Sequence, residues 1–349
     1  MGTKNDNGAA TEKMAVVGAG SWGTALAVHL ARKGVQVDLW VYEDDVAAQI
    51  QDQRENQTYL PDVEIPDGIT AHTDLGSAVK GHSVVLMVVP SHTMRGVVSN
   101  MVPHLTPGVV LASAAKGIEN DTLLTMSQVF DDVLPKELAY RRACLSGPSF
   151  ARDVGRGLPT AITAASPDRR SARLLQTIFA SPYMRVYTSN DLIGVELGGA
   201  LKNIFAIAAG ISDGLGAGAS ARAALITRGL AEMSRMGVKL GANPLTFMGL
   251  AGVGDLVLTC TGDLSRNRTV GLKLGGGQKL ADILAEMKMV AEGVKTTRSV
   301  YDLAKREEVD MPVTEQVFEV LYNNKDAQQG LMDLMTRRLK DEIDRVLMM

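Results

Sequence analysis

A run of six residues near the start of the chain, Gly18-Ala19-Gly20-Ser21-Trp22-Gly23, constrains the fold more than any other feature. It follows the apolar run Met14–Val17 and opens Thr24–Ala31, whose apolar residues recur with the period of a helix. A strand, a glycine turn and a helix in this order can bind the pyrophosphate of a dinucleotide, because the N–H groups at the helix start face the anion. An ordinary structural turn is the alternative, but the position between strand and helix favours the cofactor site.

The first half of the chain alternates between short apolar runs and helical patterns. Strand-like runs recur at Met14–Val17, Val35–Val41, Ser83–Val89, Val109–Ser113, Ala143–Ser146 and Thr160–Ala164. Helical patterns lie between several of them, at Trp22–Lys33, Val46–Gln53, Thr93–Met101, Thr122–Val133 and Arg169–Ala180. This alternation predicts an α/β fold of the Rossmann type, a doubly wound parallel sheet with helices on both faces.

Ligands of such sheets bind at the carboxyl ends of the strands. In this chain those ends are Gly18–Gly23, Tyr42-Glu43, Pro90-Ser91-His92 and Lys116-Gly117. We therefore expect these segments to converge on one crevice.

The second half of the chain has a different pattern. From about Asp191 onward the helical stretches are Leu192–Ser212, Ala221–Met236, Lys279–Glu286, Thr296–Glu308, Thr314–Tyr322 and Leu331–Leu347. This predicts an all-α domain over residues 191–349, after a dinucleotide-binding domain over residues 13–190 and a disordered tail over residues 1–12. The last helix carries apolar residues from Leu331 to Leu347, including Leu339, on one face, so we expect that face to pack on the body of the protein.

Composition narrows the function classes. The chain of 349 residues carries a formal net charge of −3, which gives no general attraction to nucleic acid or to anionic membranes. The longest apolar runs, such as Val84–Val89, are too short to span a bilayer. Its two cysteines, Cys144 and Cys260, offer neither a disulfide framework nor the spacing of metal ligands. We expect a cytoplasmic protein with no metal, no nucleic-acid partner and no membrane insertion.

Lys202 is the one cation in the long apolar stretch Val195–Phe205. A buried lysine is costly unless it is paired, and its pKa then shifts readily, which suits acid/base catalysis. The alternative is a lysine whose amine reaches the surface, which is the commoner fate. Asp255 follows Gly252-Val253-Gly254 and could pair with a lysine or bind a hydroxyl, but from the pattern alone we favour an N-cap of the next helix.

Ser265-Arg266-Asn267 stands at the start of a further helical pattern that runs to Leu274. A helix start with a hydroxyl, a guanidinium and an amide can hold a phosphate, and it can equally be a solvated, capped start. Lys116 ends a strand and could neutralise a phosphate or simply be solvated. The turn Gly147-Pro148-Ser149 would let a ligand approach the backbone.

Two further residues have weaker signals. His92 could carry a proton or merely line the nucleotide crevice. Cys260 could be a nucleophile, but no basic residue flanks it closely, so we favour an inert buried thiol.

Several segments in a fixed order across both halves resemble one enzyme family. They are Val17–Ala27, Val88–His92, Ala115–Glu119, Leu145–Ala151, Gly194–Asn203, Thr227–Met233, Gly252–Cys260 and Ser265–Asn267. From about Lys13 to Lys340 the chain resembles the bacterial NAD(P)-dependent glycerol-3-phosphate dehydrogenases.

The resemblance implies an enzyme that interconverts dihydroxyacetone phosphate and sn-glycerol 3-phosphate by hydride transfer and supplies glycerol 3-phosphate for phospholipid synthesis. It implies that Lys202 is the acid/base and that the protein is a homodimer. The positions that match substrate-binding ones are Lys116, Gly147, Ser149, Lys202, Asp255, Ser265, Arg266 and Asn267. Those that match cofactor-binding ones are Gly18, Gly20, Ser21, Trp22, Gly23, Tyr42, Lys116, Ala151, Arg266, Val290 and Glu292.

One departure from the family bears on the choice between NAD and NADP. Relatives often have Arg or His at the position of Tyr42, where it can meet the 2′-phosphate of NADPH. Here Glu43 follows, at about 20 residues from the glycine turn, and an acidic residue there favours the free ribose hydroxyls of NAD. We therefore expect a preference for NADH.

Two rival interpretations remain at this point. A dehydrogenase of the β-hydroxyacid or 6-phosphogluconate type would share both domains and a lysine acid/base, but gives no reason for Gly254-Asp255-Leu256 together with Ser265-Arg266-Asn267. A nucleotide-binding redox sensor would leave Lys202 dispensable and would need a partner-binding module that the sequence does not reveal.

Overall fold

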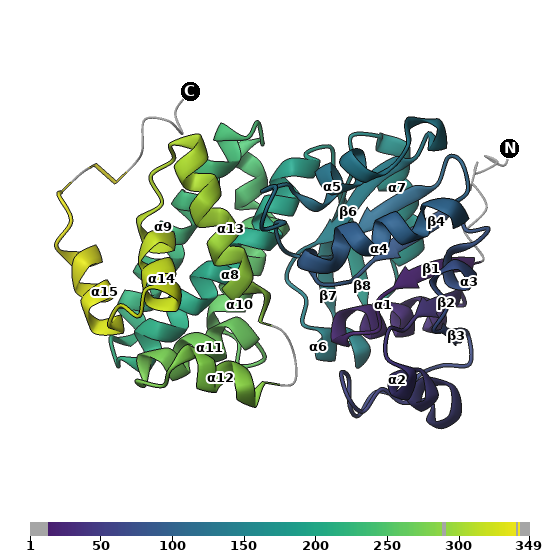
Figure 1. Cartoon of the computed structure of the whole chain (residues 1–349), viewed down its shortest axis with the longest axis horizontal. Helices are drawn as coiled ribbons and strands as arrows, with labels where there is room; N and C mark the ends of the chain where they lie inside the picture. The colour runs from purple at the N-terminus through teal and green to yellow at the C-terminus, as the bar shows by residue number, and fades with distance from the viewer. Residues whose placement is uncertain (1–12, 288–290, 340, 343–349) are drawn as a thin grey trace, which may run out of the picture.

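The computed structural model of the chain describes residues 13–287, 291–339, 341 and 342, arranged as a sheet-containing half and a helical half (Figure 1). The sheet half ends with a strand at Ser189, and the first long helix of the other half begins at Leu192. The predicted disordered tail and Val290 lie outside the described residues.

The sheet has eight strands in the order β3-β2-β1-β4-β5-β6-β7-β8. Their bounds are β1 Lys13–Val17, β2 Gln36–Trp40, β3 Ile69–His72, β4 Val84–Met87, β5 Val110–Ser113, β6 Arg141–Ser146, β7 Thr160–Ala165 and β8 Met184–Ser189. The order reverses at β1, between β2 and β4, which is the position where open parallel sheets bind ligands. The predicted Rossmann-type fold is confirmed.

Two details of the predicted sheet are wrong. The pair β6–β7 is antiparallel, whereas every other neighbouring pair is parallel. The connection between them contains only α6, Ala151–Gly155, whose five residues extend about 7.5 Å. That helix is too short to carry the chain back to the other end of the strands. β7 therefore starts at the end of the sheet where β6 stops, and it runs in the opposite direction. The strands β3 and β8, at the two edges of the sheet, also lie outside the predicted strand-like runs.

Helices cover both faces of the sheet, as Figure 1 shows. They are α1 Ser21–Arg32, α2 Asp44–Ala48, α3 Leu75–Val79, α4 Met94–Met101, α5 Met126–Val133, α6 and α7 Arg169–Phe179. Alternate residues of β4 enter different cores, with Leu86 on the side of α1 and Val85 and Met87 on the side of α4 and α5. This double burial explains why β4 has no polar alternation.

Two predicted helices of this half are shorter than expected. The helix predicted from Thr122 begins only at Met126, because Thr125 forms a capping box with Gln128 at that point. The helix predicted over Val46–Gln53 is α-helical only to Ala48 and continues as a single π-helical turn.

The helical half is built around α8, Leu192–Gly214, which is buried along almost its whole length. Around it lie α9 Gly218–Lys239, α10 Asp255–Thr261, α11 Arg266–Gly275, α12 Leu280–Glu286, α13 Glu292–Glu307, α14 Pro312–Tyr322 and α15 Ala327–Met335. By length and composition α8 could cross a membrane, but 89% of its most apolar window is buried inside the protein. It is the core helix of this half.

The last predicted helix is wrong in its extent. α15 ends at Met335, and Leu339 is 94% exposed instead of packed on the body. Beyond the helix, Arg337 pairs with Asp310 at 3.1 Å. The remaining apolar residues of that prediction, from position 343 on, lie outside the described residues.

The helices α8 and α11 cross with their backbones in contact. A Cβ added at Gly210 would lie 2.1 Å from the Arg268 carbonyl oxygen, and one at Gly271 would lie 2.0 Å from the Ile207 carbonyl oxygen. Only glycine permits this approach, and it fixes the start of α11 beside the helix that carries Lys202.

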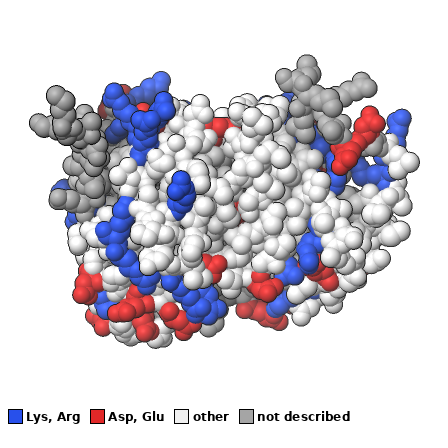
Figure 2. All heavy atoms as spheres, turned by 180° about the vertical axis from the view of Figure 1, so that it is seen from behind, with Lys and Arg blue, Asp and Glu red and all other residues white. Residues whose placement is uncertain are grey.

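The charged side chains on one face of the molecule gather mainly near its edges (Figure 2). On the face in Figure 2, Lys and Arg alternate with Asp and Glu along the lower edge, and the middle is largely uncharged.

Candidate active site

A cleft of about 1020 Å³ lies at the carboxyl ends of the parallel strands and is lined by residues of both halves. Members of all four strand-end segments predicted to converge line it, among them Gly18, Glu43, Pro90 and Lys116. The predicted crevice is therefore confirmed. The helical half contributes residues of α8, α10, α11 and the start of α13.

The glycine turn has the geometry that a pyrophosphate requires. Gly18 has φ +113°, and a Cβ there would lie 2.9 Å from the Val88 carbonyl oxygen. A Cβ at Gly23 would lie 1.8 Å from the Gly18 carbonyl oxygen, so α1 can pack this closely only with glycine. Gly20 faces open space and leaves the first N–H groups of α1 without a side-chain cap. These donors can receive an anion.

Trp22 supplies a second observation that fits a bound ligand. Its indole Nε1 is buried and has no hydrogen-bond partner among the described residues. The Lys116 Nζ lies 5.8 Å from the centre of the same ring. A buried N–H donor is normally satisfied, so this atom beside the glycine turn fits a polar group of a bound cofactor.

The end of the cleft at Glu43 contains a tyrosine, Tyr59, that the sequence analysis missed. Tyr59 donates a hydrogen bond of 2.8 Å from its hydroxyl to Oε1 of Glu43. Burial and then the Glu43 carboxylate raise the pKa of Tyr59 to about 12, so the hydroxyl stays protonated. Asn56 holds this loop on the glycine turn with a hydrogen bond of 2.9 Å to the Ala19 carbonyl. Tyr42 lies at the mouth of the cleft and is 78% exposed.

At the base of the cleft two lysines share one carboxylate. Lys202, on α8, is only 5% exposed and forms an ion pair with Asp255, which is fully buried. The Lys116 Nζ lies 2.8 Å from the other oxygen of Asp255. The surface position considered for Lys202 is therefore wrong, and so is the N-cap favoured for Asp255. Asp255 is the first residue of α10, and the lysines take both of its oxygens.

Burial and neighbouring charges together set the pKa values of Lys202 and Asp255. Burial lowers the pKa of Lys202 to about 7, the Asp255 carboxylate opposes this shift, and the Lys116 ammonium adds to it. For Asp255 burial acts to raise the pKa, but the two ammonium groups outweigh it and the pKa is lowered. A lysine that titrates near neutrality can both donate and accept a proton.

Thr259 is a further cleft residue that the sequence analysis missed. Its hydroxyl donates a hydrogen bond of 2.6 Å to the Asp255 carbonyl and lies 3.3 Å from the Asp255 Oδ1. It lines the cleft one helical turn after Asp255. That spacing is the signal that could have identified it.

A chain of amides connects the strand end to the helices. Asn203 donates to the Lys116 carbonyl at 3.0 Å and accepts from Asn267 at 2.9 Å. Asn267 in turn accepts from the Gly293 N–H at 3.0 Å. This chain holds α8, α11 and α13 together around the cleft. It also occupies the side-chain oxygen of Asn267.

The start of α11 is a capped helix start, as one interpretation expects, but its cap residue Ser265 is buried instead of solvated and the turn forms a wall of the cleft. Ser265 is the N-cap and accepts a hydrogen bond of 3.2 Å from the Arg268 N–H. Arg266 lines the cleft, where burial lowers its pKa and the nearby Glu292 carboxylate opposes this shift. Glu292 accepts from the Ser91 N–H at 3.1 Å, and burial raises its pKa.

Not every predicted site residue reaches the cleft surface. Ser149 and Ala151 line it, whereas Gly23, Gly147 and Asp255 lie behind it. Gly147, with φ +139°, presents its carbonyl to the Lys116 Nζ at 3.1 Å.

The remaining candidates are less prominent. His92 lines the cleft, and burial lowers its pKa. Cys260 is fully buried, and this burial raises the pKa of its thiol to about 12, as expected for an inert cysteine. Within the described residues, no group of three or more His, Cys, Asp or Glu side chains could hold a metal ion.

Comparison with known proteins identifies the family. Residues 13–172 match the model of the NAD-dependent glycerol-3-phosphate dehydrogenase N-terminus, and residues 191–332 match that of the C-terminus. The chain belongs to this family. It is therefore an oxidoreductase, and the rival interpretations as a dehydrogenase of another type or as a redox sensor are set aside.

Individual relatives agree with the family match. The glycerol-3-phosphate dehydrogenase [NAD(P)+] of Geobacter sulfurreducens is 57% identical over 332 residues, which are 95% of this chain and 99% of the relative. That of Syntrophobacter fumaroxidans is 56% identical over 329 residues, 94% of this chain and 97% of the relative. The crystal structure of glycerol-3-phosphate dehydrogenase from Coxiella burnetii is 42% identical, has a TM-score of 0.89 and covers 93% of this chain and 99% of its own.

Proposed function

We propose that the protein interconverts dihydroxyacetone phosphate and sn-glycerol 3-phosphate with NAD(H) or NADP(H). One observation carries the proposal: a buried lysine with a lowered pKa lies in a cleft between a dinucleotide turn and a helix start that carries an arginine. The first feature suits proton transfer at a carbonyl, the second holds the cofactor, and the third suits a phosphate group. Membership of the family supports this combination.

The residues present fit a nicotinamide dinucleotide. The glycine turn and the N–H groups at Ser21 and Trp22 would hold its pyrophosphate, and Glu43 would accept from its ribose. Lys116, Ala151, Arg266 and Glu292 lie further along the same cleft. When bound, the reduced nicotinamide supplies hydride to the C2 carbon of the ketone.

Lys202 is proposed as the acid and base. In reduction its ammonium donates a proton to the C2 oxygen, which becomes the hydroxyl, and in oxidation the neutral amine removes that proton. Its charge also stabilises negative charge that develops on the C2 oxygen. Asp255 holds the amine in place, while burial, with a smaller contribution from the Lys116 ammonium, keeps the pKa of Lys202 low enough for both directions.

The phosphate of the substrate is proposed to bind at the start of α11. The N–H groups of the first turn, the Ser265 hydroxyl and the Arg266 guanidinium are the donors available there. We also propose Asn267 and Ser149 as substrate contacts, whereas Gly147 and Asp255, which lie behind the cleft surface, would act by holding Lys116. Asn267 would use its backbone N–H, because its side chain already bonds Asn203 and Gly293.

We propose NADH as the preferred cofactor. The Glu43 carboxylate would accept from free ribose hydroxyls and would repel a 2′-phosphate. Tyr59 supports this choice because it fixes Oε1 of Glu43 and leaves Oε2 for a ribose hydroxyl.

We further propose that residues 13–190 form the cofactor domain and residues 191–349 the substrate domain. The enzyme would be a cytoplasmic homodimer that supplies glycerol 3-phosphate for phospholipid synthesis. Both cysteines are free and buried, which suits a reducing compartment, and symmetric dimers are the commonest oligomers. Light scattering of the purified protein would reveal its mass in solution, and a monomer would refute the homodimer.

A two-cofactor assay tests substrate and cofactor together. Loss of NADH absorbance on adding dihydroxyacetone phosphate is expected, with a higher kcat/KM for NADH than for NADPH. No turnover with either cofactor would refute the function. A clear NADPH preference would refute only the role of Glu43.

A further inference from the structure

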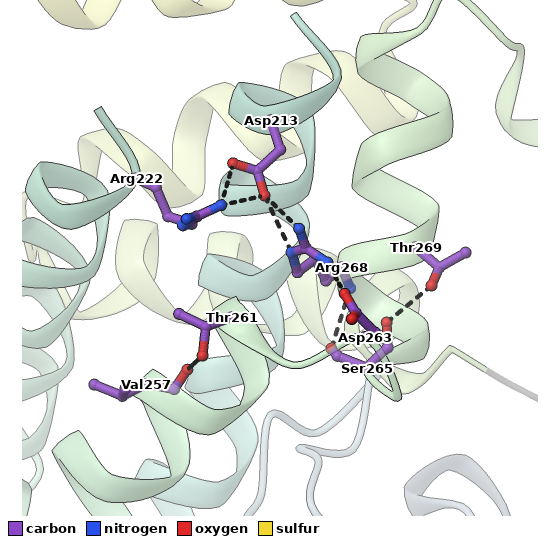
Figure 3. A network of polar contacts seen from close by, with 8 residues as sticks. All are labelled: Asp213, Arg222, Val257, Thr261, Asp263, Ser265, Arg268 and Thr269. Atoms are coloured by element: carbon purple, nitrogen blue, oxygen red, sulfur yellow. Dashed lines mark hydrogen bonds and ion pairs between the residues drawn. The ribbon is translucent and has the colours of Figure 1, made fainter. Parts of the chain in front are cut away.

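A network of charged residues lies behind the proposed phosphate site, and Figure 3 shows it from close by. Asp213, near the end of α8, accepts from Arg268 of α11 at 2.7 Å and 3.1 Å. It also accepts from Arg222 of α9, at 2.9 Å and 3.0 Å for its two oxygens. One carboxylate therefore joins three helices.

Arg268 is fixed from several sides. Its Nη1 lies 3.0 Å from Asp263, and its backbone N–H bonds the Ser265 hydroxyl. Its carbonyl is where a Cβ of Gly210 would clash, so its backbone lies against α8. The side chains of Arg268 and Asp213 are 16% and 10% exposed, which distinguishes this pair from a surface ion pair.

Arg268 lies in the same helical turn as the residues proposed to bind the phosphate, so the network can affect that site. It comes two residues after Arg266, in the turn that would hold the phosphate, yet it does not line the cleft. Its guanidinium pairs instead with the carboxylates of Asp213 and Asp263. It thus sets the orientation of the turn and neutralises two carboxylates near an anion site.

We propose that Arg268 is a positioning residue for the substrate phosphate: held by Asp213, it fixes the first turn of α11 so that Ser265 and Arg266 face the phosphate. This inference rests on the proposed function. The guanidinium fork is required, because a lysine keeps the charge but cannot bond Asp213 through two nitrogen atoms. Arg222 bonds the same carboxylate from α9, outside the proposed site, and provides a matched control.

The test compares Arg268→Lys with Arg222→Lys by steady-state kinetics. For Arg268→Lys we expect the KM for dihydroxyacetone phosphate to rise about tenfold, as for the loss of one hydrogen bond to a charged group. The KM for NADH and kcat should change less than threefold, since neither the glycine turn nor Lys202 is touched. Arg222→Lys should leave all three constants within twofold, by the same reasoning.

Dihydroxyacetone, which has no phosphate, separates positioning from general loosening of the site. The low kcat/KM for this ketone should be equal in wild type and Arg268→Lys. An equal loss with both ketones would overturn the proposal, as would a KM effect no larger than that of Arg222→Lys.

Calorimetric titration with inorganic phosphate tests the role of Arg268 without requiring enzymatic activity. Weaker phosphate binding by Arg268→Lys than by Arg222→Lys supports it, even if wild type fails to reduce dihydroxyacetone phosphate and the proposed function falls. Equal phosphate binding overturns it. If Arg268→Lys does not fold, Asp213→Asn replaces it, with the same expected results.

Discussion

Replacing Asp255 by Asn gives the sharpest test of how the site controls its proton. The substitution preserves the size of the side chain but removes the one negative charge that both lysines contact. The Asp255 carboxylate acts to raise the pKa of Lys202, whereas burial and Lys116 lower it. The variant keeps only the two lowering effects, so the pKa of Lys202 must fall below its wild-type value of about 7.

The size of the effect follows from the contact. An opposite charge within hydrogen-bond distance changes a pKa by about 1 to 3. At pH 8, above the pKa in either protein, a decrease of about 2 lowers the protonated fraction of Lys202 roughly a hundredfold. Reduction needs the protonated amine, so kcat/KM for dihydroxyacetone phosphate should fall by this factor. Oxidation needs the neutral amine, which is already the main form of Lys202 at pH 8 in both proteins. The substitution therefore should not lower kcat/KM for oxidation by this factor.

The assay is the pH profile of kcat/KM in both directions, because this constant reports pKa values of the free enzyme. In wild type the reduction should fall above about pH 7 and the oxidation should rise through the same range. In Asp255→Asn both limbs should move to lower pH. Asp333→Asn is the control, because that carboxylate on α15 pairs with Lys325 and with neither lysine of the site.

Stability must be followed in the same variant. Removing one member of a buried ion pair costs about 3–5 kcal/mol, so thermal unfolding sets the temperature at which the kinetics are valid. An unchanged profile, or limbs that move to higher pH in a folded variant, would refute the assignment of Lys202 as the titrating group.

Two further predictions concern the cofactor and the helix crossing. Glu43→Gln should lower the ratio of kcat/KM for NADH to that for NADPH about tenfold, because the amide no longer repels a phosphate, and a ratio equal to wild type would contradict this role. Gly210→Ala should lower the free energy of unfolding by about 1–3 kcal/mol, since the added Cβ meets the backbone of α11. Gly96→Ala, where a Cβ meets nothing within 4 Å, should instead raise it by about 0.5–1 kcal/mol in the same denaturant titration, and equal signs would refute the crossing.

The sequence predicts those parts of the fold that depend on local pattern. The glycine turn, the unbroken apolar β4 and the long helix α8 all follow from spacing and composition. The direction of β7 does not, because it depends on the length and packing of α6 rather than on the strand itself.

The candidate site likewise has a part that sequence motifs predict and a part that depends on the tertiary fold. Motifs locate Lys202, Asp255 and Arg266 individually, but their pairing depends on which helices meet. From the sequence alone Asp255 resembles a helix cap, and only the approach of α8 and of the strand end with Lys116 brings two ammonium groups to it. No sequence pattern predicts the contact between Tyr59 and Glu43, because the two residues are 16 positions apart and meet through a loop that Asn56 anchors.

The central claim, that Lys202 transfers the proton, is tested most directly by Lys202→Ala. We measure kcat for reduction of dihydroxyacetone phosphate by NADH, and the affinity for NADH by its fluorescence on binding. We expect kcat to fall by about 100-fold or more, the usual contribution of general acid catalysis, while the Kd of NADH stays within threefold. A folded variant that retains its kcat, or one that loses NADH binding instead, would contradict it.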